Sequence, residues 1–134
     1  MEVTASTSQR GIVAAVADRG YLAGYTPDQL IARQLVKELE ELCEALQSIT
    51  APDNTLHDLL FDAARLGKFA RAVFDTPSLF GGVTIDCDAL LSELPDLVVP
   101  LAVAADTLGV DDMLAVARDK ANADIARGVR NGTA

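Results

Sequence analysis

Glutamates crowd one short stretch of the chain, "KELEELCEAL" at residues 37–46, which holds four of them with leucines between. In a helix, Glu38, Glu41 and Glu44 step by three residues and lie along one slowly drifting stripe of the surface. Carboxylates at this spacing repel one another, by roughly 0.2–0.5 kcal/mol for each pair. The stretch therefore predicts either a well-solvated acidic surface or a site where cations compensate the charge.

A second acidic pair lies in "SELPDLVVPL", where Glu93 and Asp96 are also three residues apart and precede the most apolar run of the chain. Either motif alone is more often a solvated helix surface than a metal site. Both, however, border apolar residues, because Leu39, Leu42 and Cys43 alternate with the first group of acids. Acids beside a stripe that is expected to be buried favour a functional role.

Convergence of the two acidic groups would create a cation site. If their helices pack antiparallel, four or five carboxylates meet in a partly desolvated cleft and repel strongly. Divalent cations relieve that repulsion, and carboxylate oxygens suit Mg²⁺ or Mn²⁺, whereas the Cys and His that zinc prefers are nearly absent. The expected metal ligands are Glu38, Glu41, Glu44, Glu93 and Asp96.

Helical periodicity accounts for most of the chain, and neither strand alternation nor an internal repeat is found. The expected fold is all-α, a four-helix bundle with an extra short N-terminal helix, in one domain spanning 1–134 with loose ends at 1–9 and 129–134. A short helix is expected within 11–20, followed by a helix that is capped by Thr26, has Pro27 at its first position and runs to Leu46. Two further helices are expected over about 55–75 and 86–108, the second ended by Gly109. A last helix is expected within 110–128, capped by Asp111 or Asp112.

Composition narrows the class of protein. The chain has 134 residues, is half hydrophobic with 4% aromatic residues and carries a formal charge of −9. This balance predicts an aliphatic core and argues against direct binding to nucleic acid, which needs a basic surface. No run is long enough to span a membrane, and the N-terminus lacks a secretory signal. Cys43 and Cys87, far apart and outside any CxxC pair, are expected to be buried, reduced thiols, so we expect a cytoplasmic protein.

These motifs, taken in their order along the chain, resemble those of a known protein family. "RQLVKELEELCEAL" resembles the first motif helix of the MazG-like, all-α nucleoside triphosphate pyrophosphohydrolases, in which an Arg precedes EExxE. "LLSELPDLVVPLAVAADTLGVDDMLAVARDKANADIARG" is similar to their second half, with ExxD, an apolar helix, a Leu-Gly-hydrophobic-Asp turn and a last helix with a Lys and an Asn. The likeness covers about residues 26–49 and 86–128.

The first motif aligns in two ways. One alignment places EExxE on Lys37, Glu38 and Glu41, which loses its first Glu. The other places it intact on Glu40, Glu41 and Glu44. We prefer the first alignment, because Arg33, Leu35, Val36, Leu42, Ala45 and Leu46 then fall where the family has similar residues.

The resemblance implies an activity. Family members hold two or more Mg²⁺ or Mn²⁺ ions, which bind the triphosphate while water attacks the α-phosphorus, giving monophosphate and pyrophosphate. Glu38 and Glu41 are then the expected catalytic residues, and Lys120 and Asn122 the expected ligands of phosphate or sugar. Arg33 is expected to support the metal carboxylates or to pair with an acid such as Glu38. A (deoxy)nucleoside triphosphate, with dGTP or dATP favoured, is the expected substrate, and a homodimer or homotetramer the expected assembly.

Two features depart from the family. The link between Glu41 and Glu93 is longer and contains an inserted helix over 55–75, on which Lys68 and Arg71 either face phosphate or are simply solvated. Pro95 lies inside ExxD, so that helix is expected to begin near Ser92 or to kink. The inserted helix and the loop at Gly81–Gly82 are the expected determinants of base specificity.

Two other functions compete with hydrolysis. A ferritin-like di-iron site needs ExxH on two helices, but His57 is the single histidine, Asn54 lies three residues before it, and we expect His57 at the surface near a helix start. A non-enzymatic acidic helical protein would use the same glutamates as a partner surface. It would show neither dependence on Mg²⁺ or Mn²⁺ nor release of pyrophosphate.

Overall fold

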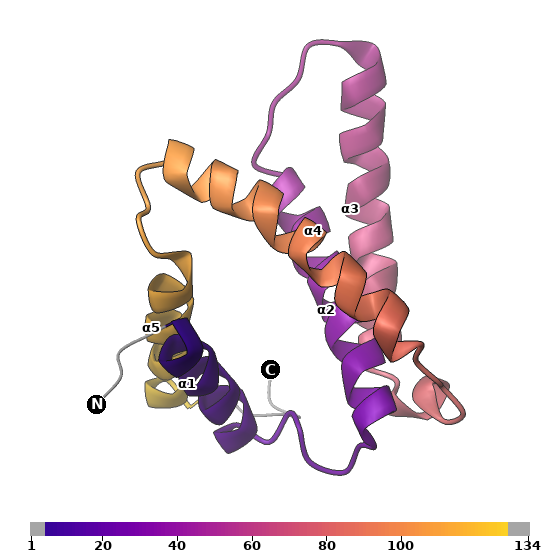
Figure 1. The fold of residues 1–134 in the computed structure, drawn as a ribbon. Coiled ribbons are helices and arrows are strands. Elements are labelled where there is room, and N and C mark those ends of the chain that lie inside the picture. Colours follow the sequence, from indigo (N-terminus) through magenta and orange to yellow (C-terminus); the bar gives the residue numbers. More distant parts are fainter. Residues whose placement is uncertain (1–4, 129–134) are drawn as a thin grey trace. The chain divides into compact units, whose positions relative to one another are not determined.

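A computed structural model describes residues 5–128 of the chain. These residues form five α-helices and one short 3₁₀-helix, with no strand among them, which confirms the all-α expectation (Figure 1). The elements are α1 (Ala5–Asp18), α2 (Pro27–Leu46), α3 (Asn54–Phe74), η1 (Pro77–Phe80), α4 (Cys87–Thr107) and α5 (Met113–Ala126). None of the helices in this range has the length and hydropathy needed to cross a membrane.

The chain divides into two compact units. One unit, Tyr25–Ile85, contains α2, α3 and η1, and the other contains α1, α4 and α5. In the first unit α2 and α3 pack along each other, and in the second α1 packs on α5.

Local capping explains where the helices begin. Thr26 caps α2 as expected: its hydroxyl accepts from the backbone N–H of Gln29 while the Gln29 side chain accepts from the N–H of Thr26, and Pro27 follows at the first helical position. Asp53 caps α3 and Asp112 caps α5, each by accepting hydrogen bonds from backbone N–H groups of the first turn. The predicted cap Thr26 and, of the two residues predicted for the last helix, Asp112 are thus confirmed, whereas the cap Asp53 was not predicted.

The α2–α3 pair is held by close contact of small residues. On α3 the side facing α2 is Leu60, Ala63, Gly67, Ala70 and Phe74. A Cβ added at Gly67 would lie 2.9 Å from the Cβ of Cys43, so the two helices touch there without room for a methyl group. Gln47 joins the far end of the pair by donating to the carbonyls of Cys43 and Leu60, at 3.1 and 3.2 Å.

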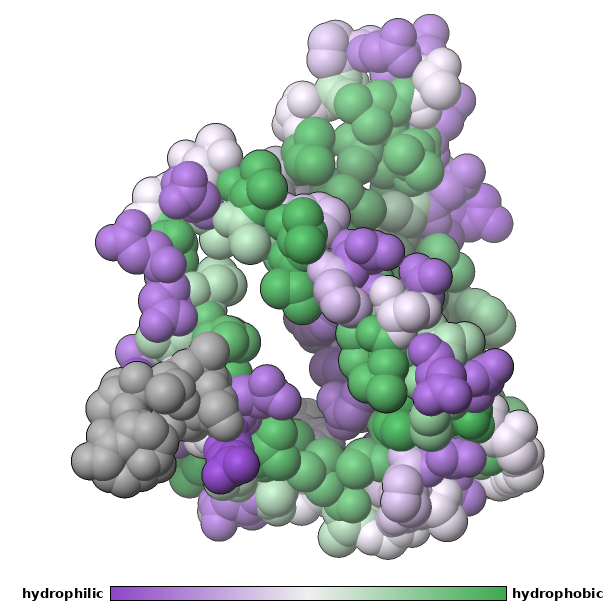
Figure 2. Space-filling model, in the orientation of Figure 1, coloured by the Kyte–Doolittle hydropathy of each residue, from purple (hydrophilic) through white to green (hydrophobic). Residues whose placement is uncertain are grey.

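Two leucines of α2 lie outside the side that α3 covers. Leu39 and Leu42 are 38% and 47% exposed, whereas Arg33, Glu40 and Cys43 are buried. The expectation that the glutamates border a buried apolar stripe is therefore confirmed for Cys43 and wrong for Leu39 and Leu42, because α3 packs on a neighbouring side of the helix. Figure 2 shows further hydrophobic residues at the surface of α3 and along α4. The exposed hydrophobic residues of these two helices include Leu59, Phe69, Val98, Val99 and Val103.

The second unit is joined through polar groups. On α5, Asp124 meets Arg19 at 3.4 Å, and Arg118 donates to the Ser8 hydroxyl of α1, also at 3.4 Å. Gly11 of α1 lies against the aliphatic part of Arg118, with 3.2 Å between an added Cβ and Cδ. The contact between α1 and α5 thus combines long, flexible polar side chains with the buried Ala15 of α1 and Ala121 of α5.

Helix α4 runs through both of its prolines. It begins at Cys87 behind the cap Asp86, which confirms the helix expected over about 86–108, and Pro95 and Pro100 lie inside it, so of the two alternatives raised by Pro95 a start near Ser92 is not found. Packing against α1 and α5 is slight, and the expected burial of its apolar run does not hold: in the described chain only Ala105 of this helix is buried. Gly109, at φ +87°, ends the helix as expected, with its N–H on the carbonyl of Asp106.

The structure also tests three smaller expectations. Residues 5–9, assigned to a loose end, lie in α1, while 1–4 and 129–134 are outside the described residues. Both cysteines are free, but only Cys43 is buried, since Cys87 is exposed at the first position of α4. His57 is exposed in the first turn of α3, as expected.

Candidate metal site on α2

Three carboxylates of α2 form the tightest acidic group that the described residues contain. Glu40, Glu41 and Glu44 each offer one oxygen, and these oxygens lie within 4.8 Å of one another. Their spacing of one, three and four residues brings them to adjacent positions on one side of the helix. They are the residues of the second, intact alignment of EExxE. Glu38 is exposed on the same helix and is not part of the group.

Two cations compensate this charge. Glu40 is only 4% exposed, and its oxygens meet the Lys37 ammonium at 2.8 Å and the Arg71 guanidinium of α3 at 3.7 Å. Lys37 also approaches Glu41 at 3.2 Å. Glu44 has no ion pair within the part of the chain that is described. Three carboxylates thus face two cations, and one negative charge is left over.

The Lys37 ammonium responds to these neighbours. Burial alone would lower its pKa, but hydrogen bonds and charges from Glu40 and Glu41 outweigh burial and hold the pKa above its ordinary value. Lys37 is therefore a firm positive charge at neutral pH. It occupies the carboxylates that a metal ion would need, and it would compete with that ion.

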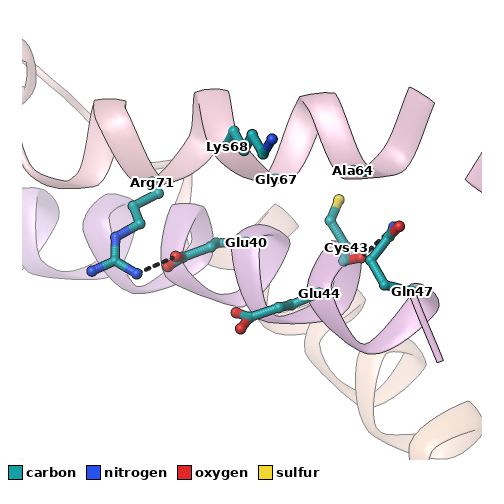
Figure 3. A pocket seen from close by; sticks show the side chains of 8 residues that line it. All are labelled: Glu40, Cys43, Glu44, Gln47, Ala64, Gly67, Lys68 and Arg71. Carbon is teal, nitrogen blue, oxygen red and sulfur yellow. Dashed lines mark hydrogen bonds and ion pairs between the residues drawn. The ribbon is translucent and has the colours of Figure 1, made fainter. Parts of the chain in front are cut away.

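An open pocket of about 260 Å³ adjoins the group, between α2 and α3. Figure 3 shows Glu40 and Glu44 on the α2 side, with Arg71 reaching Glu40 from α3 and Lys68 on the same side of α3. Cys43 and Gly67 form the floor where the helices touch. The pocket thus joins carboxylates of one helix to cations of the other, and it lies wholly within one unit.

The remaining sequence-predicted ligands lie elsewhere. Glu93 and Asp96 are exposed on α4, in the other unit, and their joining with the α2 acids stays a prediction. Lys120 and Asn122 are exposed on α5. Lys120 meets Asp124 at 3.4 Å, and its expected role toward phosphate also stays a prediction.

Asp124 is surrounded by cations, whereas the carboxylates of α2 lie beside one another. It meets Arg19, Lys120 and Arg127, the last through a hydrogen bond within α5 and its cap. Burial would raise the pKa of Asp124, but the hydrogen bond from Arg127 and the charges of Lys120 and Arg127 outweigh it, so the pKa is lowered.

Arg33 takes neither of its two expected positions. It is 3% exposed and forms no ion pair within the described residues, with Glu38 or with any other acid. Its Nη2 donates to the Phe74 carbonyl at 2.9 Å, and its guanidinium stacks on the rings of Tyr25 and Phe74, at 4.3 and 4.1 Å. Pairing with Glu38 was thus a wrong prediction, because α2 turns Arg33 toward the end of α3.

Sequence reasoning ranked Glu40 below Glu38, although Glu40 is the most buried acid of the site. A signal was present: Arg33, Glu40 and Cys43 are spaced seven and three residues apart, which places them on one side of a helix. Lys37, counted as a lost ligand, is the cation that bridges Glu40 and Glu41.

Comparison with known proteins adds no assignment. No protein-family model matches this chain, and neither a curated protein nor a solved structure does.

Proposed function

We propose that the chain is a metal-dependent nucleoside triphosphate pyrophosphohydrolase with a MazG-like arrangement of helices. The observation that carries the proposal is the group of Glu40, Glu41 and Glu44 beside a pocket that also holds Lys68 and Arg71. The sequence resemblance over about residues 26–49 and 86–128 supports the same activity, with Glu93 and Asp96 as further ligands. Acids and cations side by side suit a substrate that brings both phosphate and a divalent metal.

The donor set fits Mg²⁺ or Mn²⁺. All three side chains offer hard oxygen atoms, and ligand oxygens 2.0–2.1 Å from one ion lie about 3–4 Å from each other. The present limit of 4.8 Å therefore asks only for small rotations, chiefly of the exposed Glu41 and Glu44 toward the buried Glu40. When bound, such ions neutralise phosphate oxygens and lower the pKa of a water molecule.

The chain's own residues would then position the substrate. Glu41, which is 55% exposed at its side chain, can turn from Lys37 toward an ion. Lys68 and Arg71 stand on α3 within reach of phosphate oxygens that enter the pocket. Water attacks the α-phosphorus, the bond to the bridging oxygen breaks, and nucleoside monophosphate and pyrophosphate leave.

Product analysis tests the proposal. Purified protein is incubated with each (d)NTP and Mn²⁺, and the products are separated. We expect monophosphate and pyrophosphate, in amounts that depend on the metal and vanish with EDTA. Diphosphate with orthophosphate would contradict the mechanism. No product with any nucleotide would favour the non-enzymatic acidic protein.

A further inference from the structure

Arg33 is the one buried charge of the α2–α3 unit that the metal site does not use. It is 3% exposed, and its Nε and Nη1 are buried without a hydrogen-bond partner. A buried donor left without an acceptor is unfavourable, and more so on a charged group. A hydrogen-bond acceptor supplied by a ligand would satisfy these two donors, so the position of Arg33 favours the binding of such a group.

Three aromatic rings surround the buried Arg33 guanidinium and stabilise its charge. Tyr25, Phe74 and Phe80 lie 4.3, 4.1 and 5.9 Å from the guanidinium carbon, measured to the ring centroids. They are three of the six aromatic residues of the whole chain. Cation–π contact holds the guanidinium charge without an anion. A flat acceptor group hydrogen-bonded to the guanidinium would lie in the same plane, among the same rings.

Phe80 covers this environment from the end of the short helix η1. It ends η1, whose N-cap Thr76 makes no side-chain cap bond, and Gly81 and Gly82 follow it, the latter at φ +119°. Both ends of the segment are anchored: the Thr76 hydroxyl donates to the Ala72 carbonyl at 2.8 Å, and the Ile85 N–H donates to Asp28 at 3.2 Å. An opening of the middle with both ends in place would uncover Arg33.

The distance along α2 links Arg33 to the acids. Arg33 and Glu40 are seven residues apart on the buried side of the helix, about two turns or 10 Å along its axis. A ligand that reached both would hold a flat group at one end and phosphates with metal at the other. A nucleotide has this form.

We propose that Arg33 reads the nucleobase when η1 carries Phe80 away, and that it selects guanine over adenine; the assignment rests on the proposed function for its phosphate end. A guanidinium only donates hydrogen bonds. Guanine offers it two acceptors on one edge, O6 and N7, whereas adenine pairs N7 with an amino donor that would face another donor.

Nucleoside binding without metal tests the assignment. Deoxyguanosine and deoxyadenosine are titrated calorimetrically into the full chain in EDTA, as wild type, Arg33→Lys, Phe80→Ala and Arg65→Lys. Arg65→Lys is the matched control, since Arg65 is an exposed arginine of the same unit, on α3. We expect the wild type to bind deoxyguanosine about tenfold or more tightly than deoxyadenosine, as one good Arg–guanine pair allows. Arg33→Lys should bring the ratio close to one, and Arg65→Lys should leave it unchanged.

Phe80→Ala keeps the test decisive should Arg33→Lys fail to fold, as judged by circular dichroism. Removing the covering ring should tighten deoxyguanosine binding severalfold. Equal affinities for the two nucleosides in the wild type, a preference that survives in Arg33→Lys, or no gain in Phe80→Ala would each overturn the assignment. So would displacement of deoxyguanosine by inorganic phosphate, which would make Arg33 a phosphate ligand.

The two proposals fail separately. If the protein discriminates the two bases in EDTA but hydrolyses no nucleotide, Arg33 still selects the base, and the chain is a nucleotide-binding protein and not a hydrolase. Metal-dependent release of pyrophosphate with the same dGTP to dATP ratio in wild type and Arg33→Lys would remove only the base assignment.

Discussion

The α2–α3 pair and the α1–α5 pair are each joined by an ion pair at a largely buried acid, but the charges around that acid differ. Glu40 meets Arg71 across the first pair, and Asp124 meets Arg19 across the second. Glu40 has two more carboxylates beside it, whereas Asp124 has two more cations. A buried acid between two helices can therefore serve packing alone. It becomes a candidate cation site only where neighbouring carboxylates exceed the available positive charge.

The two pairs also differ in how closely their backbones approach. Gly67 lies against the Cβ of Cys43, while Gly11 lies against the flexible side chain of Arg118. The first contact fixes the distance between α2 and α3 and with it the width of the pocket. The second leaves α1 and α5 free to adjust. The closer and less adjustable contact is therefore found between α2 and α3, the pair that carries the glutamates.

Glu41→Gln should have the largest effect. Gln keeps the shape of Glu but removes the charge of a residue shared by both alignments of the motif. We expect turnover to fall by about 100-fold or more, beyond the 10- to 100-fold typical of losing a supporting group near a metal. Pyrophosphate release measures it, with circular dichroism as the folding control. An active Glu41→Gln protein would rule out the proposed ligand set.

Gly67→Ala should break the close contact of α2 and α3. Alanine favours a helix over glycine by about 1 kcal/mol, but its methyl would lie 2.9 Å from the Cβ of Cys43. We expect a net loss of about 1–3 kcal/mol in the free energy of unfolding, as overpacking typically costs. Gly11→Ala is the control: only a flexible side chain must move, so unfolding in urea should show no loss, or a gain of up to about 1 kcal/mol. Equal effects of the two substitutions would deny the contrast.

Asp124→Asn should weaken the α1–α5 pair. The change leaves Arg19 without its acid and also removes the partner of Lys120 and Arg127, and we expect a loss of about 1.5–3 kcal/mol at pH 7, the range for a hydrogen bond to a charged group. Because Arg127 and Lys120 hold the folded-state pKa of Asp124 below its ordinary 3.8, the stabilisation is present above that value and is lost as pH falls through the lowered pKa. Wild type should therefore approach the variant in stability below pH 3.8. A difference that stays constant from pH 7 to pH 2 would contradict the ion-pair account.

Lys37→Met should have the smallest effect, and in the opposite direction for ligand binding. The ammonium competes with a metal ion for Glu40 and Glu41. The pair with Glu41 is exposed on both sides, at 38% and 55%, and such pairs are worth about 0.2–1 kcal/mol, so freeing Glu41 should tighten Mn²⁺ binding up to about fivefold. Arg65→Met should leave the affinity unchanged, because Arg65 pairs with Asp62 and does not line the pocket beside the acids. Weaker binding in Lys37→Met would show that Lys37 supports the site.

The sequence predicted what depends on near neighbours. The capping of α2 by Thr26, the cap of α5 at Asp112 and the end of α4 at Gly109 follow from residues within one turn. The all-α class follows from periodicity in the same manner. The helix expected over about 86–108 is found as α4, at Cys87–Thr107. The expected burial of its apolar run was wrong, because burial depends on tertiary contacts that neighbouring residues do not determine.

The site was predictable only in part, because burial depends on which side of a helix its partner covers. The acidic stripe was evident, but the choice between Glu38 and Glu40 needed the position of α3, whose Arg71 meets Glu40. Gly67 decides that position by allowing close contact. Nothing adjacent to Arg33 in the sequence signals Phe74 or Phe80, which lie more than forty residues later, so its aromatic surroundings were not foreseen.

Mn²⁺ titration followed by electron paramagnetic resonance tests the metal site most directly, with wild type and Glu41→Gln compared at equal protein concentration. The account predicts saturable loss of the free Mn²⁺ signal in wild type and binding at least about tenfold weaker in the variant. Identical titration curves for the two folded proteins, or no binding by either, would contradict it.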